Sequence, residues 1–455
     1  MNITYGLEET PSGAVFILAS LQWLMFMVAN VITVPIVLGH AFSLSEAQIA
    51  LFTTRTLFLC GLVSLVQGLW GHRYAILEGP AGMWWGVFLV LIQMTHEIHG
   101  SIAGLQMDLE LGLMVAGVLY VVLAATGWLQ RIQGWFTPAV TGCFLVLLAM
   151  QVSRDILDGL LGIGFRGSAA VQPLVAGVSL LLIVFTLLLM VKGRGLWKNM
   201  AVLIALASGW LLYGVIGWLD IPSRAGQAAF ALPSVFPWGR PVFQASIVIT
   251  CGLTALILLS NLIASIQAFA GVAGEQPAPG RYRRGTLVSG LGTALAGVLG
   301  TVGAVPLTAA AGLVSLTGIA SRLPFLVAAG ALTLMGLFPI VGEYAATLPP
   351  PVGYAVLFTV FVQLLGYGLR DIKRLALDGR DLWVVGLPLM TGVGLLFVPG
   401  SAWEMLPPVF GYLLGNGLIV GVILVLLLEH CVFRRGGKTA PASTVAGRDR
   451  PTIDR

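Results

Sequence analysis

One acidic side chain, Glu78, lies where it could carry a proton or bind a polar solute. It is the one carboxylate that we place well inside a long apolar run. A charge near the centre of a bilayer costs at least a few kcal/mol, so a residue of this kind is a functional candidate. The alternative is that Glu78 ends the run at the membrane surface, where it would form an exposed ion pair close to His72 and Arg73.

Uncharged polar and aromatic side chains in other apolar runs could hold a small molecule. The indole rings of Trp23 and Trp84 could stack on a planar solute, although Trp is also the usual anchor at a membrane interface. Each polar residue could instead make a hydrogen bond between helices. The polar residues concerned are Gln22, Asn30, Ser260, Asn261, Ser265 and Gln267.

Gly and Pro interrupt the beginning of two apolar runs, 75–95 and 302–319. Lipid cannot satisfy backbone N–H and C=O groups, so such breaks must be buried in protein or line a polar cavity. A matched pair of breaks in two halves of a chain points to a transport site near the middle of the bilayer. Alternatively, these residues only kink packed helices. They are Gly79, Pro80 and Gly82 in the first run, and Gly303 and Pro306 in the second.

We expect no cofactor, no metal and no enzymatic activity. His96, Glu97 and His99 are close enough to suggest a metal site, but we interpret them as part of a solvated loop. The four cysteines are scattered without metal-ligand spacing. No nucleophile lies beside a base, and no cofactor loop is present.

These residues belong to a chain whose composition is that of a multi-pass membrane protein. Of its 455 residues, 58% are hydrophobic and 9% are charged, whereas about 25% of a soluble domain is charged. A helix of about 20 apolar residues spans a bilayer. We therefore predict an all-α membrane fold with fourteen spans: 13–39, 47–70, 75–95, 110–129, 135–152, 170–191, 197–217, 243–270, 285–300, 302–319, 323–345, 349–369, 381–398 and 408–432.

Basic residues alternate between the connections. Most Lys and Arg fall in the even-numbered connections and in the tail, and an excess of Lys and Arg marks the cytoplasmic side. Both termini are therefore expected in the cytoplasm, and the net charge of +5 needs no nucleic-acid partner. The last residues, 434–455, are predicted to form a disordered tail.

Several motifs together resemble those of the nucleobase-ascorbate transporters, also called xanthine/uracil permeases, and most closely those of a divergent bacterial branch of purine permeases. The resemblance covers nearly the whole chain. It implies fourteen spans in a 7+7 inverted repeat, with a core domain (1–129 and 241–347) that moves against a gate domain (130–240 and 348–433) like an elevator. The motifs are Ser20–Trp23, Val34–Pro35, His72–Arg73, Glu78–Pro80, Trp84–Gly86, Phe136–Gly142, Ala231–Pro233 and Ala309–Gly318.

The chain departs from this family at two anchoring positions. The family's acidic residue in the eighth span corresponds to Ser260, and its acidic or amide residue in the tenth corresponds to Ala309. The resemblance still assigns main-chain contacts to Gly82, Leu307 and Thr308. Buried polar groups of a base need partners, and we expect Glu78, Ser260, Asn261, Gln22, Trp23 and Trp84 to supply them.

We therefore predict a secondary transporter for a purine or pyrimidine base in the bacterial cytoplasmic membrane. The resemblance implies coupling to a proton or to sodium, with Glu78 as the proton carrier, and a possible homodimer. A uniporter or exchanger for another small or anionic solute is the alternative, because losing two acidic residues while keeping two helix N-termini would favour an anion. A non-transporting sensor or scaffold is disfavoured, because broken helices without a ligand are hard to explain.

Overall fold

The computed structural model describes residues 3–97, 101–128, 135–193, 201–219, 229–399, 402 and 414–433. Predictions for His99 and for the tail 434–455 lie outside these residues, as do parts of the predicted spans 197–217 and 408–432. In the described part the fold is helical apart from two short strands. The first half contains α1 (Gly13–Val31), α2 (Thr33–Ala41), α3 (Glu46–Leu69), β1 (Glu78–Pro80), α4 (Gly82–Glu97), α5 (Ile102–Thr126), α7 (Pro138–Leu161), η1 (Phe165–Gly167), α8 (Pro173–Lys192) and α10 (Ala201–Ile216).

The second half repeats the order of a long helix, a strand and a shorter helix. A strand separates α12 from α13, as another separates α3 from α4. The elements are α11 (Ala245–Ala273), α12 (Pro279–Val298), β2 (Ala304–Pro306), α13 (Ala309–Thr317), α14 (Arg322–Met335), α15 (Pro339–Ala346), α16 (Pro350–Lys373), α17 (Gly379–Leu395), α19 (Gly417–Leu427) and the π-helical turn η3 (Leu428–Val432).

Local sequence accounts for many helix ends. Ser45 begins α3 with a capping box, in which its side chain accepts from Gln48 N and the Gln48 side chain accepts from Ser45 N. Thr137 is the N-cap of α7, where its side chain accepts from Val140 N. Pro138 follows as the first helical residue. Gly274 ends α11 with a φ of 72°, a left-handed conformation that suits Gly.

The helices present apolar side chains to the outside, as expected in lipid. Leu180 on α8 is 63% exposed and Val215 on α10 is 81% exposed. Within the described residues, seven helices are long and apolar enough to cross a membrane, or eight if the bent pair α14 and α15 counts as one span. That pair turns by 82° at residues 336–338, so the predicted straight span 323–345 is bent. The count of fourteen spans stays a prediction.

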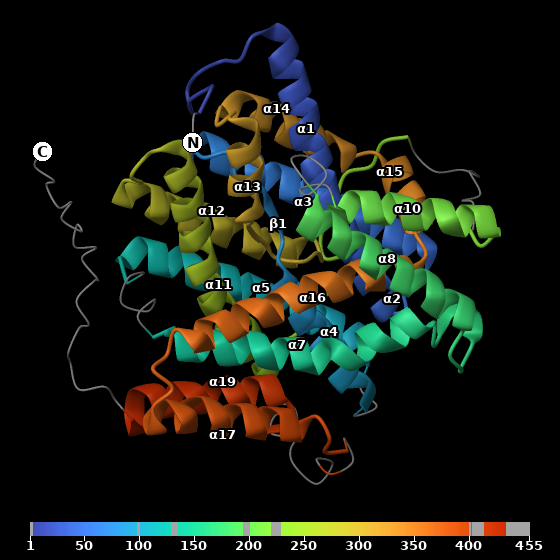
Figure 1. Ribbon diagram of the computed structural model, residues 1–455, viewed down its shortest axis with the longest axis vertical. Helices are drawn as coiled ribbons and strands as arrows, with labels where there is room; N and C mark the ends of the chain where they lie inside the picture. Colours follow the sequence, from blue (N-terminus) through green and yellow to red (C-terminus); the bar gives the residue numbers. More distant parts are fainter. Residues whose placement is uncertain are drawn as a thin grey trace, which may run out of the picture.

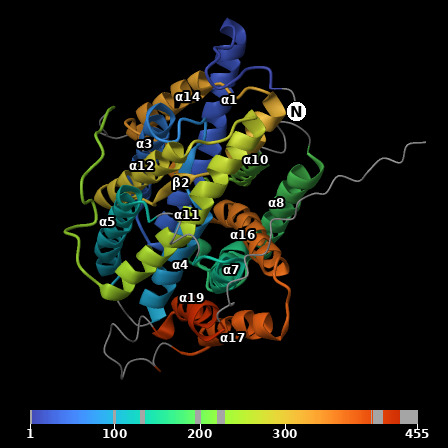
Figure 2. The same cartoon turned by 90° about the vertical axis from the view of Figure 1, so that its left-hand side faces the viewer.

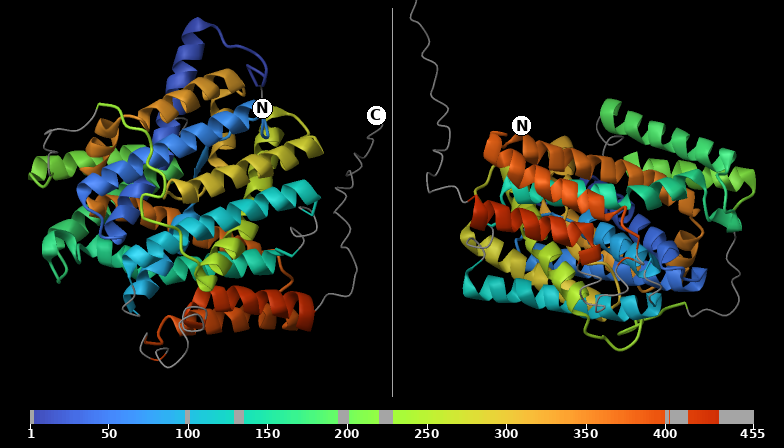
Figure 3. Two further views of the ribbon diagram at one scale, coloured as in Figure 1. Left: turned by 180° about the vertical axis from the view of Figure 1, so that it is seen from behind. Right: turned by 90° about the horizontal axis from the view of Figure 1, so that it is seen from below.

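The helices pack in two neighbouring groups. Figure 3 (left) shows α3, α12 and α5 lying side by side, and contacts join α5 to α11 and α3 to α14. Helices α7, α16, α17 and α19 also contact one another, and Figures 1 and 2 show α17 and α19 at the opposite end of the molecule from α1. The division into core and gate domains is compatible with this packing and stays a prediction.

Helices α5 and α12 approach at glycines. An added Cβ on Gly117 would overlap the backbone of Gly290 and Ala294, and an added Cβ on Gly297 would overlap the backbone of Glu110. Small residues at such crossings let helix backbones come close in a membrane.

Gly117→Val is therefore expected to destabilise the protein by about 1–3 kcal/mol or more, because neither backbone can move away without separating the helices. Thermal unfolding of the purified protein in detergent measures this change. Gly252→Ala on α11 is the matched control, since nothing lies within 4 Å of its added Cβ. Equal melting temperatures for the Gly117→Val variant and the unsubstituted protein would contradict the close crossing.

Candidate functional site

The two predicted helix breaks are present, and they pair with each other. β1 and β2 are antiparallel, with Glu78 opposite Pro306 and Pro80 opposite Ala304. The six residues of the two strands are buried. Each strand ends on Pro, which lacks an N–H group and keeps the residue before it out of the helical region. The extended backbone therefore follows from the sequence, and the pairing satisfies its polar groups away from water.

A helix begins directly after each strand. In the first turns, Trp84 N–H donates to the Ala81 carbonyl at 2.9 Å and Ala310 N–H to the Leu307 carbonyl at 3.1 Å, and each helix N-terminus carries a partial positive charge. Thr308 and Ala309 are exposed at the beginning of α13, and nothing lies within 4 Å of a Cβ added to Gly312 one turn later. An uncovered N-terminal face of this kind can bind a polar or anionic group.

Helix α16 borders the beginning of α4. A Cβ added to Gly82 would lie 2.9 Å from Leu364 Cδ1, and one added to Gly86 would lie 2.9 Å from Phe361 Cζ. These glycines therefore let α4 contact α16 closely, and the contacting side chains are apolar. Two helices that meet at an apolar surface of this kind can move past each other without breaking ion pairs.

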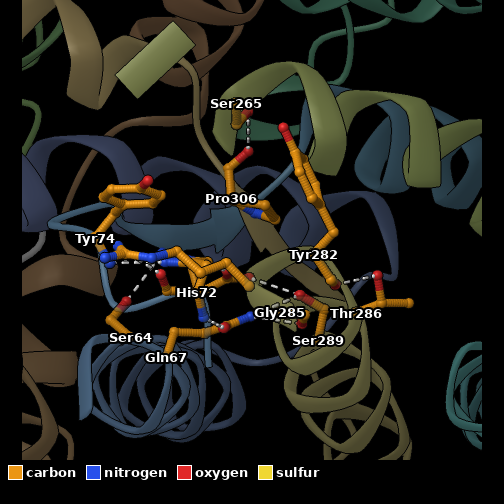
Figure 4. Close-up of polar contacts among 12 residues, drawn as sticks. Ser64, Gln67, His72, Tyr74, Ser265, Tyr282, Gly285, Thr286, Ser289 and Pro306 are labelled. Atoms are coloured by element: carbon orange, nitrogen blue, oxygen red, sulfur yellow. Dashed lines mark hydrogen bonds and ion pairs between the residues drawn. The ribbon is translucent and has the colours of Figure 1, made fainter. Parts of the chain in front are cut away.

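Helix α11 holds the end of β2 in place. The Pro306 carbonyl accepts hydrogen bonds from Asn261 Nδ2 at 3.1 Å and from Ser265 Oγ at 2.9 Å. Ser265 Oγ also lies 2.9 Å from Thr308 Oγ1. Figure 4 shows Ser265 directed at Pro306. Asn261 and Ser265 are one helical turn apart, so both reach the same strand end. The predicted site residue Asn261 is thus beside the site, with its amide N–H₂ engaged by the main chain.

Comparison with known proteins identifies the family. Residues 15–401 match the model of a family described as the permease family, Xan_ur_permease. The chain belongs to the xanthine/uracil permease family. It is therefore a membrane transporter and not an enzyme.

Curated relatives cover nearly all of this permease. The "Putative purine permease YwdJ" of Bacillus subtilis is 32% identical over 423 residues, which are 91% of this chain and 95% of the relative. The uric acid transporter UacT of Escherichia coli is 24% identical over 91% of this chain and 85% of its own length. The xanthine permease XanP of Escherichia coli is 27% identical over 94% of each.

Solved structures show the same fold at low identity. The transmembrane domain of the cyanobacterial bicarbonate transporter BicA aligns with a TM-score of 0.55 and 16% identity, over 94% of the permease and 99% of that domain. The murine anion transporter Slc26a9 aligns with a TM-score of 0.63 and 12% identity, over 92% of the permease and 69% of that chain. At these identities the likeness concerns the fold alone.

The carboxyl group of Glu78 in this permease contacts α12 and His72. It is fully buried, its Oε2 accepts from Ser289 Oγ on α12 at 3.5 Å, and its Oε1 lies 3.6 Å from His72 Nε2. Because Glu78 is fully buried, the alternative that it forms an exposed ion pair at the membrane surface is wrong. Arg73 lies instead 3.9 Å from Glu8, and both are exposed. The prediction that Glu78 also contacts the substrate has no support from this placement.

The predicted aromatic residues separate into two environments. Trp84 is fully buried beneath β2, where a Cβ added to Gly303 would lie 2.6 Å from its Nε1. Trp23 packs edge to face on Phe26 and Phe325 and belongs to an apolar cluster. We therefore interpret Trp23 as a packing residue, whereas Trp84 supports the strand that carries the site.

Two further predicted site residues, Gln22 and Ser260, each have a polar atom that makes no hydrogen bond within the described residues. Gln22 Nε2 and Ser260 Oγ are buried without a hydrogen-bond partner in the part of the chain that the structure describes. Leu307 is half-buried and its N–H donates to the Leu77 carbonyl at 2.9 Å, which extends the strand pairing. No group of three metal-ligating side chains occurs among the described residues, which include His96 and Glu97. The prediction of a loop is wrong for these two residues, because both lie in the last turn of α4.

A cavity of about 470 Å³ lies away from these residues. It is lined by the turn between α2 and α3, by η1 and by the junction of α15 and α16, and includes His40, Glu46 and Arg166. None of the predicted site residues lines it.

Sequence reasoning missed the residues around the Glu78 carboxyl group. The sequence indicated His72 as part of a family motif and as a surface neighbour of Glu78, and it gave no indication of Ser289 or Gln67. Glu110, at the predicted edge of a span, is a second fully buried carboxylate, and its Oε1 accepts from Trp238 N at 3.3 Å. The signal that could have found them is the presence of polar residues within long apolar helices.

Proposed function

We propose that this permease takes up a nucleobase, with a purine such as xanthine or uric acid as the leading class, across the bacterial cytoplasmic membrane. The observation that carries the proposal is the antiparallel pairing of Glu78–Pro80 with Ala304–Pro306, from whose opposite ends the helices α4 and α13 begin. A base has hydrogen-bonding groups on its edge, and main-chain groups at Gly82, Leu307 and Thr308 would meet them. The relatives named as purine, uric acid and xanthine transporters support a base as cargo.

The chemistry of the site favours a purine that is an anion. Ser260 and Ala309 stand where the family has acidic or amide residues, and the Glu78 carboxyl group contacts α12 and His72 instead. Main-chain N–H groups at helix N-termini therefore face the solute without a nearby carboxylate, an arrangement that stabilises negative charge. Urate is an anion at neutral pH and fits this pattern.

Coupling to a proton and an elevator-like movement complete the proposal. Glu78, a buried ionisable group on the strand that supports α4, is the proton carrier. The core domain, 1–129 and 241–347, would move against the gate domain, 130–240 and 348–433, along the apolar contact of Gly82 and Gly86 with α16. The excess of Lys and Arg in the even-numbered connections supports a cytoplasmic location for both termini.

Uptake into proteoliposomes tests the function. Purified permease is given radiolabelled xanthine, urate, hypoxanthine, uracil, bicarbonate and a small organic anion, with and without an imposed proton gradient. We expect accumulation of an oxidised purine above its equilibrium level only when the gradient is present, with protein-free vesicles as the control. Uptake of none of the bases would overturn the proposal.

The alternative of an exchanger or uniporter for another anion rests on the same missing carboxylates. It predicts that bicarbonate or the organic anion is taken up at the same rate with and without the proton gradient. The same panel therefore separates the two functions.

A further inference from the structure

Glu78 and His72 form a buried pair behind the paired strands. Both side chains are 0% exposed, and Glu78 Oε1 and His72 Nε2 lie 3.6 Å apart. Neither atom has a hydrogen-bond partner in the described part of the chain. A hydrogen bond between them would need a distance of about 2.7–3.2 Å. The two atoms thus face each other across a gap that a small movement would close.

The backbone fixes the protonation of the imidazole ring. The N–H group of Tyr74 donates to His72 Nδ1 at 3.1 Å, so Nδ1 must be the unprotonated nitrogen. The ring hydrogen is then on Nε2, the atom that faces Glu78. A proton on Nδ1 would oppose the Tyr74 N–H, and the Arg281 guanidinium, 3.3 Å from the His72 carbonyl, disfavours a second positive charge nearby. His72 is therefore held neutral, as a donor.

A hydrogen-bond chain reaches the other carboxyl oxygen. Gln67 Nε2 donates to Ser289 Oγ at 2.9 Å, so the Ser289 hydroxyl is free to donate onward to Glu78 Oε2 at 3.5 Å. Gln67 is itself held by the Gly285 carbonyl at 2.9 Å. Figure 4 shows Gln67, Ser289 and Gly285 joined in this way, with Ser64 and His72 beside them. Donors in series strengthen one another in a low-dielectric interior.

Few other charged or titratable groups reach the pair. Cys60 on α3 and Tyr120 on α5 are the further titratable side chains whose charge interacts with Glu78. Towards the surface, Arg281 covers the Tyr74 ring at 4.4 Å and pairs with Glu275 at 3.5 Å. Glu275 is 40% exposed, so this group lies between His72 and the solvent.

We propose that Glu78 and His72 form the proton-binding site of this permease, in which the proton binds Glu78 Oε1 and the His72 Nε2–H group replaces it as the partner of Oε1 when the proton leaves. The carboxylic acid releases one proton and becomes a carboxylate, while the imidazole keeps its single hydrogen. His72 is thus a positioning residue and not a relay. The role in coupling rests on the proposed function, but the site itself can be tested without a substrate.

Infrared difference spectroscopy of the purified permease, titrated over pH, tests the site. The C=O band of a protonated, buried carboxyl group should disappear as pH rises, and should be absent throughout in Glu78→Gln. His72→Leu removes the donor to the carboxylate, so the same band should persist to a pH higher by about one to two units. His72→Gln retains an N–H donor of similar reach and should keep the titration of the unsubstituted protein.

Each result decides the matter. A band that does not change with pH, or that titrates alike in His72→Leu and the unsubstituted protein, overturns the proposal. So does an equal displacement in His72→Gln and His72→Leu, because it would mean that the imidazole itself titrates. His40→Leu is the control for loss of a histidine, since His40 Nε2 is also buried without a described partner but lies on α2, on the separate cavity. If the C=O band titrates as expected while no base is taken up, the proposed transport of a base is wrong and the proton-binding site is supported.

Discussion

Glu78→Gln is expected to abolish proton-driven accumulation of the substrate while exchange of substrate across the same membrane continues. Glutamine has nearly the shape of a protonated glutamate, so its amide oxygen can still accept from Ser289 while its N–H₂ group takes the place of the protonated oxygen that faces His72. It cannot release a proton, and a carrier locked in one protonation state can move its solute only down a gradient. Accumulation in proteoliposomes should fall at least tenfold, whereas counterflow exchange and substrate affinity should change little, because the carboxyl group contacts Ser289 and His72 and is not proposed to touch the solute.

The matched control is Glu110→Gln. Glu110 is also a fully buried carboxylate, and its bonded oxygen is retained in the amide. It lies on α5 outside the pair of Glu78 and His72, between the segment that contains Trp238 and Gly300, which precedes β2. We expect this variant to accumulate substrate normally. Accumulation by Glu78→Gln at the rate of the unsubstituted protein would remove Glu78 from coupling, and equal losses in both variants would point to a general effect of buried carboxyl groups.

The backbone of the site could be predicted because Pro and Gly act locally. Pro80 and Pro306 exclude helix at the residues before them whatever surrounds them. Their places at the beginnings of two apolar runs were enough to predict that both helices break. That the breaks pair residue by residue was beyond the sequence, since the register depends on how α3, α11 and α12 bring the strands together.

Side-chain directions were the part that sequence could not supply. Neighbouring residues of a strand point to opposite faces, so one position of register decides whether Glu78 faces a solute or the protein interior. Asn261 and Trp23 lie on helices, and there the packing of each helix determines that the Asn261 amide binds the Pro306 carbonyl and that Trp23 faces Phe325 on α14. Sequence placed all three on the right helices and strands, and tertiary packing determined what each side chain contacts.

Removing the two side chains that hold the Pro306 carbonyl is expected to weaken substrate binding by about tenfold to a hundredfold. Asn261→Leu with Ser265→Ala leaves a buried carbonyl without either donor, which costs about 1–3 kcal/mol. The lost hydrogen bonds destabilise the position of β2 and of α13, which follows it. The N–H groups of α13 would then no longer be held towards the solute. Ser265→Ala alone tests the anchor by itself, because Ser265 is not proposed to touch the solute, and should lower the affinity several-fold.

The affinity can be measured as the rise in melting temperature of the purified permease with increasing urate or xanthine, since a ligand that binds only the folded protein stabilises it. Ser246→Ala is the matched control. Ser246 lies on the same helix, α11, and its buried Oγ has no hydrogen-bond partner among the described residues, so its loss should leave the affinity unchanged. Unaltered ligand affinity in the double variant would show that β2 keeps its place without α11, and that the strand pairing with β1 alone positions the N-terminus of α13.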